Sequence, residues 1–293
     1  MYELVHIKGN SYYIESPSRV GVVKTGEDEV CIIDAGNNRD MGKRIKRILD
    51  EQGWRLSRIL VTHAHADHIG GCRYLSENTG CKVYASGIER DFTEHTILMP
   101  SLLYGASPLK ELKHKFLLAE PTETLPLTDD SLPEGFRVIE LCGHTPDMVG
   151  YLSPDGVAYI GDCLASRDTI DKYGISYIYD IAGYLDTLSR VREYSADVFM
   201  PSHMKPLQDI RDIVDYNIKS VHDIGDRIVK YLEDCHSFDE ILREMFSELG
   251  ITMTVEQYAL VGSTVRSYLG WLGAEGRIDL SCDDNTLVWR ACK

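Results

Sequence analysis

The chain has 293 residues, 43% of them hydrophobic, which is enough for one large domain and a smaller one. Its 31 basic and 46 acidic residues give a net charge of −15, which disfavours nucleic acid as a partner because such binding depends on Lys and Arg neutralising phosphates. No apolar run is long enough to span a membrane, the N-terminus lacks signal-peptide features, and the eight cysteines form no CxxC pair. We therefore expect a cytoplasmic protein with reduced thiols and no membrane partner.

The first elements in chain order are short strands. Alternating or continuous apolar residues predict strands at 3–8, 11–15, 20–24 and 30–33. After them, apolar residues at helical spacing predict a helix over 41–52, which ends at Gly53. We expect a further helix over 69–78 and a strand over 82–85.

The most informative segment follows the apolar run 58–61 and places four metal-capable side chains within six residues. These are His63, His65, Asp67 and His68. The first two can point at one ion while the other two turn toward a second. The glycines that follow suit a helix start where the backbone passes close to the site. This segment predicts a two-metal hydrolytic centre.

Three more candidate ligands each come directly after a predicted strand. His144 follows the strand over 137–141, Asp162 follows that over 157–160, and His203 follows that over 197–200. Another strand is expected over 148–152 and a helix over 180–194. Because a packed sheet brings its strand ends to one edge, these side chains should meet the first four.

This set of motifs resembles the metallo-β-lactamase superfamily, over about residues 1–210. The resemblance implies an α+β fold, an αββα sandwich of two sheets with helices outside. It also implies that a hydroxide between two metals is the nucleophile. For the ligands it implies His63, His65 and His144 on the first metal, Asp67, His68 and His203 on the second, and Asp162 bridging both.

The residue types themselves allow several metals. Histidine and carboxylate ligands suit zinc, which we expect as a pair of divalent ions, but iron and manganese fit them as well. Asp67 is placed to orient or deprotonate the attacking water. Asp34, after the strand over 30–33, is expected to hold the other ring nitrogen of a ligand histidine; the alternative is a turn-forming Asp. Cys163 is expected to be a small buried residue.

Three features bear on the substrate. Residues 88–133 are apolar and aromatic, and form either a roof over the metal cleft that favours an acyl or aromatic substrate, or a surface loop. Tyr177 either donates a hydrogen bond to a developing oxyanion or packs in a hairpin. Lys205 either binds a carboxylate or phosphate of the substrate or is an ordinary lysine of an exposed loop.

From about residue 212 the chain changes character. Helices are expected over 213–232, from Ser237 onward with a capping box, and over 254–272, followed by two strands around a turn at 282–285. This order resembles a winged-helix module. We therefore assign residues 1–211 to a metal-binding hydrolase domain and 212–293 to a helical C-terminal domain. Acidic residues outnumber basic ones there, so a lid or a homodimer contact is preferred to DNA reading.

The sequence thus predicts a binuclear hydrolase that cleaves a small ester-like bond in a small-molecule substrate, either a thioester or a lactone, by analogy with glyoxalase II and acyl-thioester hydrolases. Three alternatives stay open: a single-iron dioxygenase of the same fold, an endoribonuclease, and a metal-containing binding module without catalysis. Flavodiiron-type members carry a Glu where this chain has His65, which counts against oxygen or nitric oxide reduction.

Overall fold

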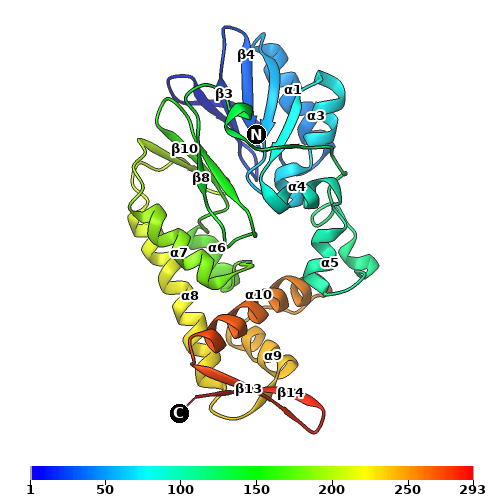
Figure 1. Ribbon diagram of the computed structural model, residues 1–293, viewed down its shortest axis with the longest axis vertical. Helices are drawn as coiled ribbons and strands as arrows, with labels where there is room; N and C mark the ends of the chain where they lie inside the picture. Colours follow the sequence, from blue (N-terminus) through cyan, green and yellow to red (C-terminus); the bar gives the residue numbers. More distant parts are fainter. Residues whose placement is uncertain (1, 293) are drawn as a thin grey trace.

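The computed structural model describes residues 2–292, and its N-terminal half is built on a seven-stranded sheet (Figure 1). Its strands lie in chain order: β1 (Leu4–Lys8), β2 (Ser11–Ile14), β3 (Val20–Lys24), β4 (Glu29–Ile33), β5 (Arg55–Leu60), β6 (Lys82–Ala85) and β7 (Leu125–Pro126). The first four pair antiparallel, and β4 to β7 pair parallel because helices connect them. The predicted strands in this region are confirmed.

A second sheet of four strands has the order β11-β10-β9-β8. Its strands are β8 (Arg137–Glu140), β9 (Val149–Leu152), β10 (Val157–Gly161) and β11 (Val198–Pro201). Only β10 and β11 are parallel, and the chain between them forms α6 (Arg167–Tyr173) and α7 (Ile181–Arg192). The strands and the helix expected here are confirmed, whereas α6 was not expected.

Strand β4 shows why the sheets stack as they do. Val30 and Ile32 face the core under α1 (Arg39–Glu51), whereas Cys31 and Ile33 face the second sheet and its Tyr151. Both faces of the strand are therefore buried, as expected for a sheet covered on both sides. A third core lies between the second sheet and α7. Helix, sheet, sheet and helix follow one another, which confirms the αββα sandwich.

The helix expected over 69–78 is in two pieces, α2 (Ala66–Ile69) and α3 (Cys72–Thr79). The break falls at Gly70 and Gly71, which pack against the loop after β4. A Cβ on Gly70 would lie 2.3 Å from the carbonyl carbon of Asn37. These glycines allow the close approach that holds the loop after β5 against the loop after β4.

Residues 87–133 are not one loop. They contain α4 (Gly87–Glu94), α5 (Leu98–Tyr104) and two single turns of 3₁₀ helix, η1 (Lys110–Leu112) and η2 (Asp129–Ser131). Met99 and Leu103, one helical turn apart, are buried, whereas Leu98 and Leu102 on the other side of α5 are exposed. The segment therefore packs on the molecule through one face.

The C-terminal part consists of α8 (Arg211–Tyr231), α9 (Phe238–Glu248) and α10 (Val255–Ala274), followed by a hairpin of β13 (Ile278–Asp283) and β14 (Thr286–Ala291). A short strand, β12 (His236–Ser237), pairs with β14. The capping box of Ser237 and Glu240 is present at the start of α9. The element order matches the expectation, and the winged-helix assignment stays a prediction.

Helix α8 joins the two parts of the molecule without a break. It packs against α7 near its start and against α9 further along, and one hydrophobic cluster runs from Ile139 in β8 to Ile278 in β13. In Figure 1, α10 extends from the hairpin, which it contacts at β13, across the molecule to α5, which it also contacts. The boundary predicted at 211/212 falls at the first residues of this shared helix.

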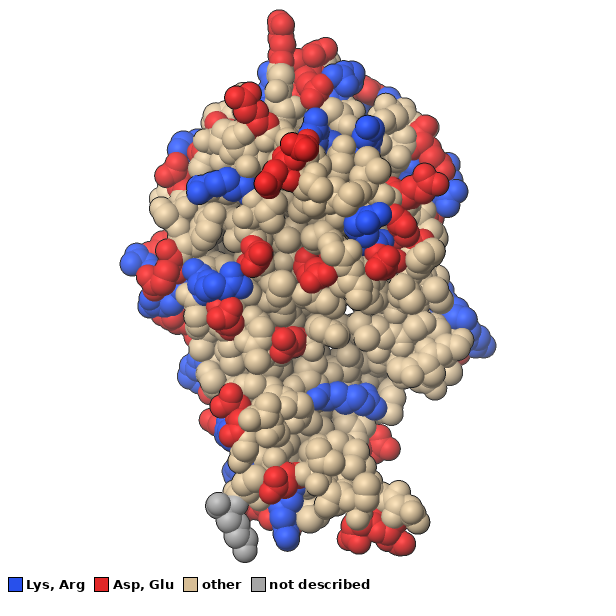
Figure 2. Space-filling view, viewed as in Figure 1, with Lys and Arg blue, Asp and Glu red and all other residues tan. Residues whose placement is uncertain are grey.

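On the face seen in Figure 2, Lys and Arg side chains are interspersed with Asp and Glu rather than gathered into a basic patch. No helix among residues 2–292 combines the length and the apolar character needed to cross a membrane.

Candidate metal centre

The candidate ligands meet at one edge of the sandwich, where five strands end. Asp34 follows β4, His63 follows β5, His144 follows β8, Asp162 follows β10, and His203 follows β11. Carboxyl ends of parallel strands are the usual location of sites in layered folds of this kind. The structure brings all seven residues of the predicted ligand set together there.

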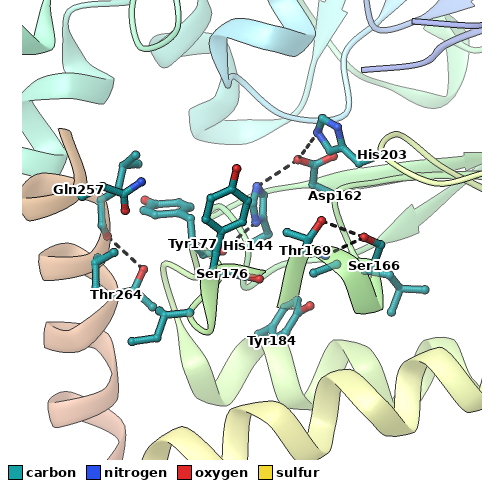
Figure 3. Close-up of a pocket in the computed structure, with 16 residues that line it drawn as sticks. His144, Asp162, Ser166, Thr169, Ser176, Tyr177, Tyr184, His203, Gln257 and Thr264 are labelled. Atoms are coloured by element: carbon teal, nitrogen blue, oxygen red, sulfur yellow. Dashed lines mark hydrogen bonds and ion pairs between the residues drawn. The ribbon is translucent and has the colours of Figure 1, made fainter. Parts of the chain in front are cut away.

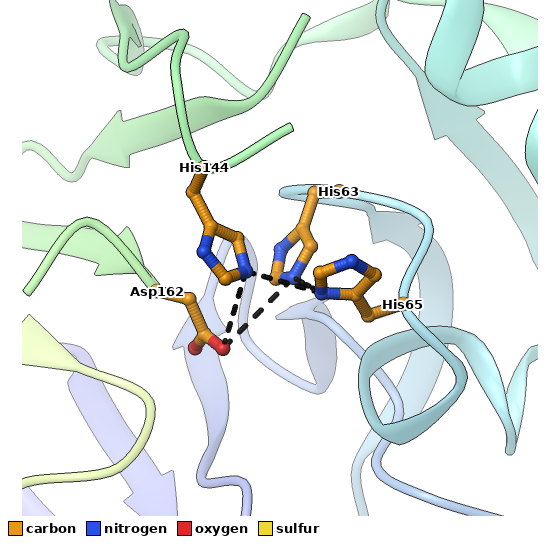
Figure 4. Close-up of side chains that lie close together, drawn as sticks. All are labelled: His63, His65, His144 and Asp162. Carbon is orange, nitrogen blue, oxygen red and sulfur yellow. Dashed lines mark hydrogen bonds and ion pairs between the residues drawn. The ribbon is translucent and has the colours of Figure 1, made fainter. Parts of the chain in front are cut away.

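The first group contains three histidines and a carboxylate (Figure 4). Nδ1 of His65 lies 3.0 Å from Nε2 of His63 and 3.1 Å from Nε2 of His144. Oδ2 of Asp162 lies 4.0 Å from Nε2 of His63 and 3.7 Å from Nε2 of His144. Four ligand atoms thus surround one small volume.

The second group lies on the other side of Asp162. Oδ2 of Asp67 is 3.6 Å from Nε2 of His68 and 3.3 Å from Nε2 of His203. Asp162 also approaches this group: its Oδ1 lies 3.3 Å from His68 Nε2 and its Oδ2 lies 3.2 Å from His203 Nε2. One carboxylate therefore contacts both groups.

Hydrogen bonds at the outer ring nitrogens orient these histidines. Nδ1 of His144 contacts the carbonyl of Tyr177 at 3.0 Å, and Nδ1 of His203 contacts the carbonyl of Pro17 at 2.9 Å. A carbonyl only accepts, so each Nδ1 donates, and when the ring is neutral its Nε2 is unprotonated and faces the centre. This is the tautomer that a metal ligand needs.

Asp34 orients two more ligands at once. Its Oδ2 lies 2.8 Å from Nδ1 of His68 and accepts a hydrogen bond of 2.8 Å from the hydroxyl of Thr62. Because that hydroxyl has given its only hydrogen to Asp34, it accepts from Nδ1 of His63, 3.0 Å away. Asp34 has a left-handed backbone with φ of 61° and is buried, so it is a histidine partner rather than an exposed turn residue.

These residues fit a pair of metal ions. Without a cation, the unprotonated nitrogens of His63 and His144 would face Nδ1 of His65 at hydrogen-bond distance. Ligands about 2.0–2.1 Å from a tetrahedral zinc ion lie about 3.3 Å apart, close to the separations observed. In addition, His68 Nε2 and Asp162 Oδ1 are buried without a hydrogen-bond partner, as expected for atoms reserved for an ion.

Protonation differs between the two groups. Burial lowers the pKa of His63 and His144, and lowers the pKa of His65 to about 3. In contrast, the nearby Asp162 carboxylate raises the pKa of His203 to about 10. The nearby carboxylates also raise the pKa of His68 well above its usual value. The first group is therefore ready to bind a cation at neutral pH, whereas His68 and His203 must first lose a proton.

A buried carboxylate that the sequence did not single out, Glu89 of α4, connects two ligand loops. Its Oε2 accepts from the backbone N–H of Ala64 at 2.8 Å. Its Oε1 accepts from the hydroxyl of Thr145 at 2.6 Å and from the backbone N–H of Asp147 at 3.1 Å. Glu89 thereby fixes the loop of His63 and His65 relative to the loop of His144.

The other candidates lie as follows. Tyr177 packs its ring edge-on against His65, with the centroids 5.2 Å apart, and residues 174–179 are irregular, so the hairpin alternative is wrong. Lys205 is exposed and is not part of either cavity that reaches the centre. Cys163 is fully buried, which raises the pKa of its thiol to about 12 and keeps it protonated. The eight cysteines are free thiols.

An αββα sandwich with a histidine-rich centre at the carboxyl ends of its strands defines a class of metal-dependent hydrolases. A family model described as the metallo-beta-lactamase superfamily matches residues 9–203, and the chain belongs to this superfamily. Similarity to a solved structure supports the same fold. A beta-lactamase domain protein from Burkholderia ambifaria has a TM-score of 0.73 at 18% identity and covers 99% of this chain and 94% of that one.

Two curated relatives add detail. The chain is 28% identical over 185 residues to the probable metallo-hydrolase YqgX of Bacillus subtilis, covering 62% of this chain and 75% of that protein. It is 32% identical over 135 residues to a hydroxyacylglutathione hydrolase of Rhodopseudomonas palustris, covering 45% of this chain but only 41% of that protein. The matched part of that enzyme is therefore less than half of its length.

Proposed function

We propose that this protein is a binuclear metallo-hydrolase that cleaves a thioester or a related small ester such as a lactone. One observation carries the proposal: two groups of ligand atoms share Asp162, and one of them includes an accessible carboxylate, Asp67. Hydroxyacylglutathione hydrolases among the relatives support a thioester over a lactone. Bound metal ions would supply an activated water near neutral pH and stabilise negative charge on the carbonyl oxygen.

The chain's own residues have distinct parts in this reaction. His63, His65 and His144 would hold the first ion, His68, His203 and Asp67 would hold the second, and Asp162 would contribute to both. The side chain of Asp67 is about one-third exposed, and the residue lines a cavity beside the centre. It is therefore placed to orient the attacking water and to take up its proton. Water adds to the acyl carbon, the carbon–sulfur bond breaks, and the thiolate takes a proton as it leaves.

The test is hydrolysis of a small panel by protein reconstituted separately with Zn, Mn and Fe. The panel contains acyl-thioesters, lactones, phosphodiesters and a β-lactam. We expect metal-dependent turnover of thioesters, and Asp67→Asn should lower it by about 10²–10⁴-fold while the fold is kept. Asp91→Asn, at an exposed position of α4, is the matched control and should leave turnover unchanged.

Other outcomes would point elsewhere. Turnover that survives in Asp67→Asn with both metals bound would show that Asp67 does not have the assigned role. Single-iron stoichiometry with oxygen uptake would indicate a dioxygenase, and salt-sensitive cleavage of RNA would indicate a nuclease. Full metal content without turnover of any substrate would indicate a binding module.

A further inference from the structure

Two cavities reach the metal centre. The larger, of about 500 Å³, lies between the centre, α6 and α10 and includes His144, Asp162 and His203 in its wall (Figure 3). The smaller, of about 240 Å³, lies toward α5 and includes His65 and Asp67. Four residues line both cavities and so mark their boundary: His144, Asp162, Tyr177 and Leu260. A substrate whose reacting carbonyl sits at the centre therefore has room for one group on either side.

Both cavities have uncharged walls outside the ligand set. The smaller is lined by apolar side chains such as Met99, Leu103 and Phe116. The larger combines aliphatic residues such as Ile175 and Val261 with neutral polar ones. Within residues 2–292, no lysine or arginine lines either cavity. The ionisable acidic and histidine side chains in the cavity walls are all candidate metal ligands. An anionic group bound in these cavities away from the metal centre would lose its water without gaining a cation, which is costly.

Several neutral polar side chains line the larger cavity. Ser176 is one of them, and its hydroxyl is buried without a hydrogen-bond partner (Figure 3). In contrast, Ser166 and Thr169 are within 2.8 Å of each other, and Thr264 donates to the carbonyl of Leu260 at 3.2 Å. Neutral polar groups in a largely apolar wall suit a neutral carbonyl, amide or hydroxyl of a ligand rather than an ion.

We infer that the preferred substrate is an uncharged thioester or ester with apolar groups on both sides of the reacting carbonyl. This inference rests on the proposed function and narrows it. A glutathione thioester fits poorly, because the tripeptide carries carboxylates and neither cavity offers them a lysine or arginine away from the metal centre. The C-terminal part takes part in this selection, since α10 supplies Gln257, Leu260, Val261 and Thr264 to the larger cavity.

The first experiment compares two thioesters with the same octanoyl group in the metal-loaded, full-length protein. One has the uncharged thiol N-acetylcysteamine and the other has glutathione. We expect kcat/KM to be about tenfold higher or more for the uncharged thioester, a ratio that corresponds to about 1.4 kcal/mol. An equal or higher kcat/KM for the glutathione thioester would overturn the inference while leaving the proposed hydrolase function intact.

A second measurement does not depend on turnover. The S-octyl thioethers of the same two thiols lack the reacting carbonyl, and their binding to the metal-loaded protein can be measured by calorimetry. We expect the uncharged thioether to bind about tenfold more tightly. If it does so while no thioester is hydrolysed, the proposed reaction fails but the uncharged site stands. Equal binding of both thioethers, or tighter binding of the glutathione derivative, overturns the inference.

A positive charge added to the wall of the larger cavity tests whether this cavity selects against the glutathione thioester. Gln257→Arg adds a cation to the larger cavity and should lower the ratio of kcat/KM between the uncharged and the glutathione thioester by several-fold. Gly273→Arg is the matched control, because it adds the same charge on α10 at an exposed position with nothing within 4 Å of a Cβ. A ratio that is unchanged in folded Gln257→Arg, or lowered equally in the control, would contradict the role of this wall.

Discussion

At the scale of single residues, the geometry of the centre depends on the ligand side chains and equally on the hydrogen bonds to their outer ring nitrogens. Asp34 illustrates this, because one carboxylate contacts His68 directly and His63 through Thr62. Its backbone has a positive φ, which asparagine also tolerates. The charge of Asp34 can therefore be removed without disturbing the backbone.

We predict that Asp34→Asn weakens binding of the second metal by about 10–100-fold. The backbone N–H of Thr62 donates to Oδ1 and keeps the amide oxygen there, so the amide nitrogen would face both His68 Nδ1 and the hydroxyl of Thr62, which donate to Oδ2 in the native protein. His68 would then favour the tautomer with a proton on Nε2, the atom needed for the ion. Competition with a chelator measures the affinity. Asp50→Asn, at an exposed carboxylate of α1 paired with Lys46, should leave it unchanged; an equal effect of both changes would rule out this explanation.

Proton release should accompany metal binding. With its pKa raised to about 10 by Asp162, His203 carries a proton at pH 7 in the metal-free protein, and an ion binds only the deprotonated ring. The pKa of His68 is also raised, so binding at the second group releases protons, and metal affinity rises with pH as these rings lose them. Calorimetry in two buffers with different ionisation enthalpies measures the release. His203→Gln should reduce it and His6→Gln should not; identical heats in both buffers would contradict the prediction.

At the scale of elements, the loops after the strands carry the ligands, and α4 holds two of these loops together. Glu89 accepts hydrogen bonds from both, and its acceptor-only carboxylate matches donors at Ala64, Thr145 and Asp147. Glu94, one and a half turns later on the same helix, provides a comparison: its Oε1 accepts two hydrogen bonds from Thr124, far from the ligand loops.

We predict that Glu89→Gln lowers the free energy of unfolding by about 1–3 kcal/mol, because the amide NH₂ must face a buried donor. It should also weaken binding of the first metal, since the loops of His63 and His144 lose their common anchor. Thermal unfolding and metal titration measure these effects. Glu94→Gln should leave metal affinity unchanged, and Glu89→Asp should restore part of it; if affinity falls equally in Glu94→Gln, the anchor is not specific.

The sequence predicted what is encoded locally. Each ligand follows a strand with a clear apolar pattern, so strand ends and ligands were found together. Helix α6 was missed although Ser166 caps it and Gly174 ends it, because only Ile170 is buried and no apolar periodicity arises. Glu89 was missed because its donors are mostly backbone N–H groups brought close by the fold. Its place shortly after β6, like the ligands after their strands, was the available signal.

At the scale of the whole molecule, the metal-binding sandwich and the C-terminal helices share one hydrophobic cluster. Val214 and Val221 of α8 and Tyr268 of α10 are buried in the same cluster as Ile160 of β10. The helix that begins at the predicted domain boundary is therefore part of the core of both parts. Such continuity favours cooperative unfolding, because opening one part would expose apolar surface of the other.

We predict a single unfolding transition for the metal-free protein in differential scanning calorimetry, and not separate transitions for the residues before and after 211. Ile228→Ala, in the C-terminal half of α8 at a fully buried position, should lower the stability of the whole molecule by about 2–5 kcal/mol and shift that one transition. Leu280→Ala is the matched control, because Leu280 of β13 is 66% exposed and its loss should change little. If Ile228→Ala instead splits the transition, and the sandwich unfolds at its original temperature, then the two parts are independent. The C-terminal helices would then be an attached module whose α10 reaches the metal centre only by docking, and selection of the substrate by Gln257 would depend on that docking equilibrium.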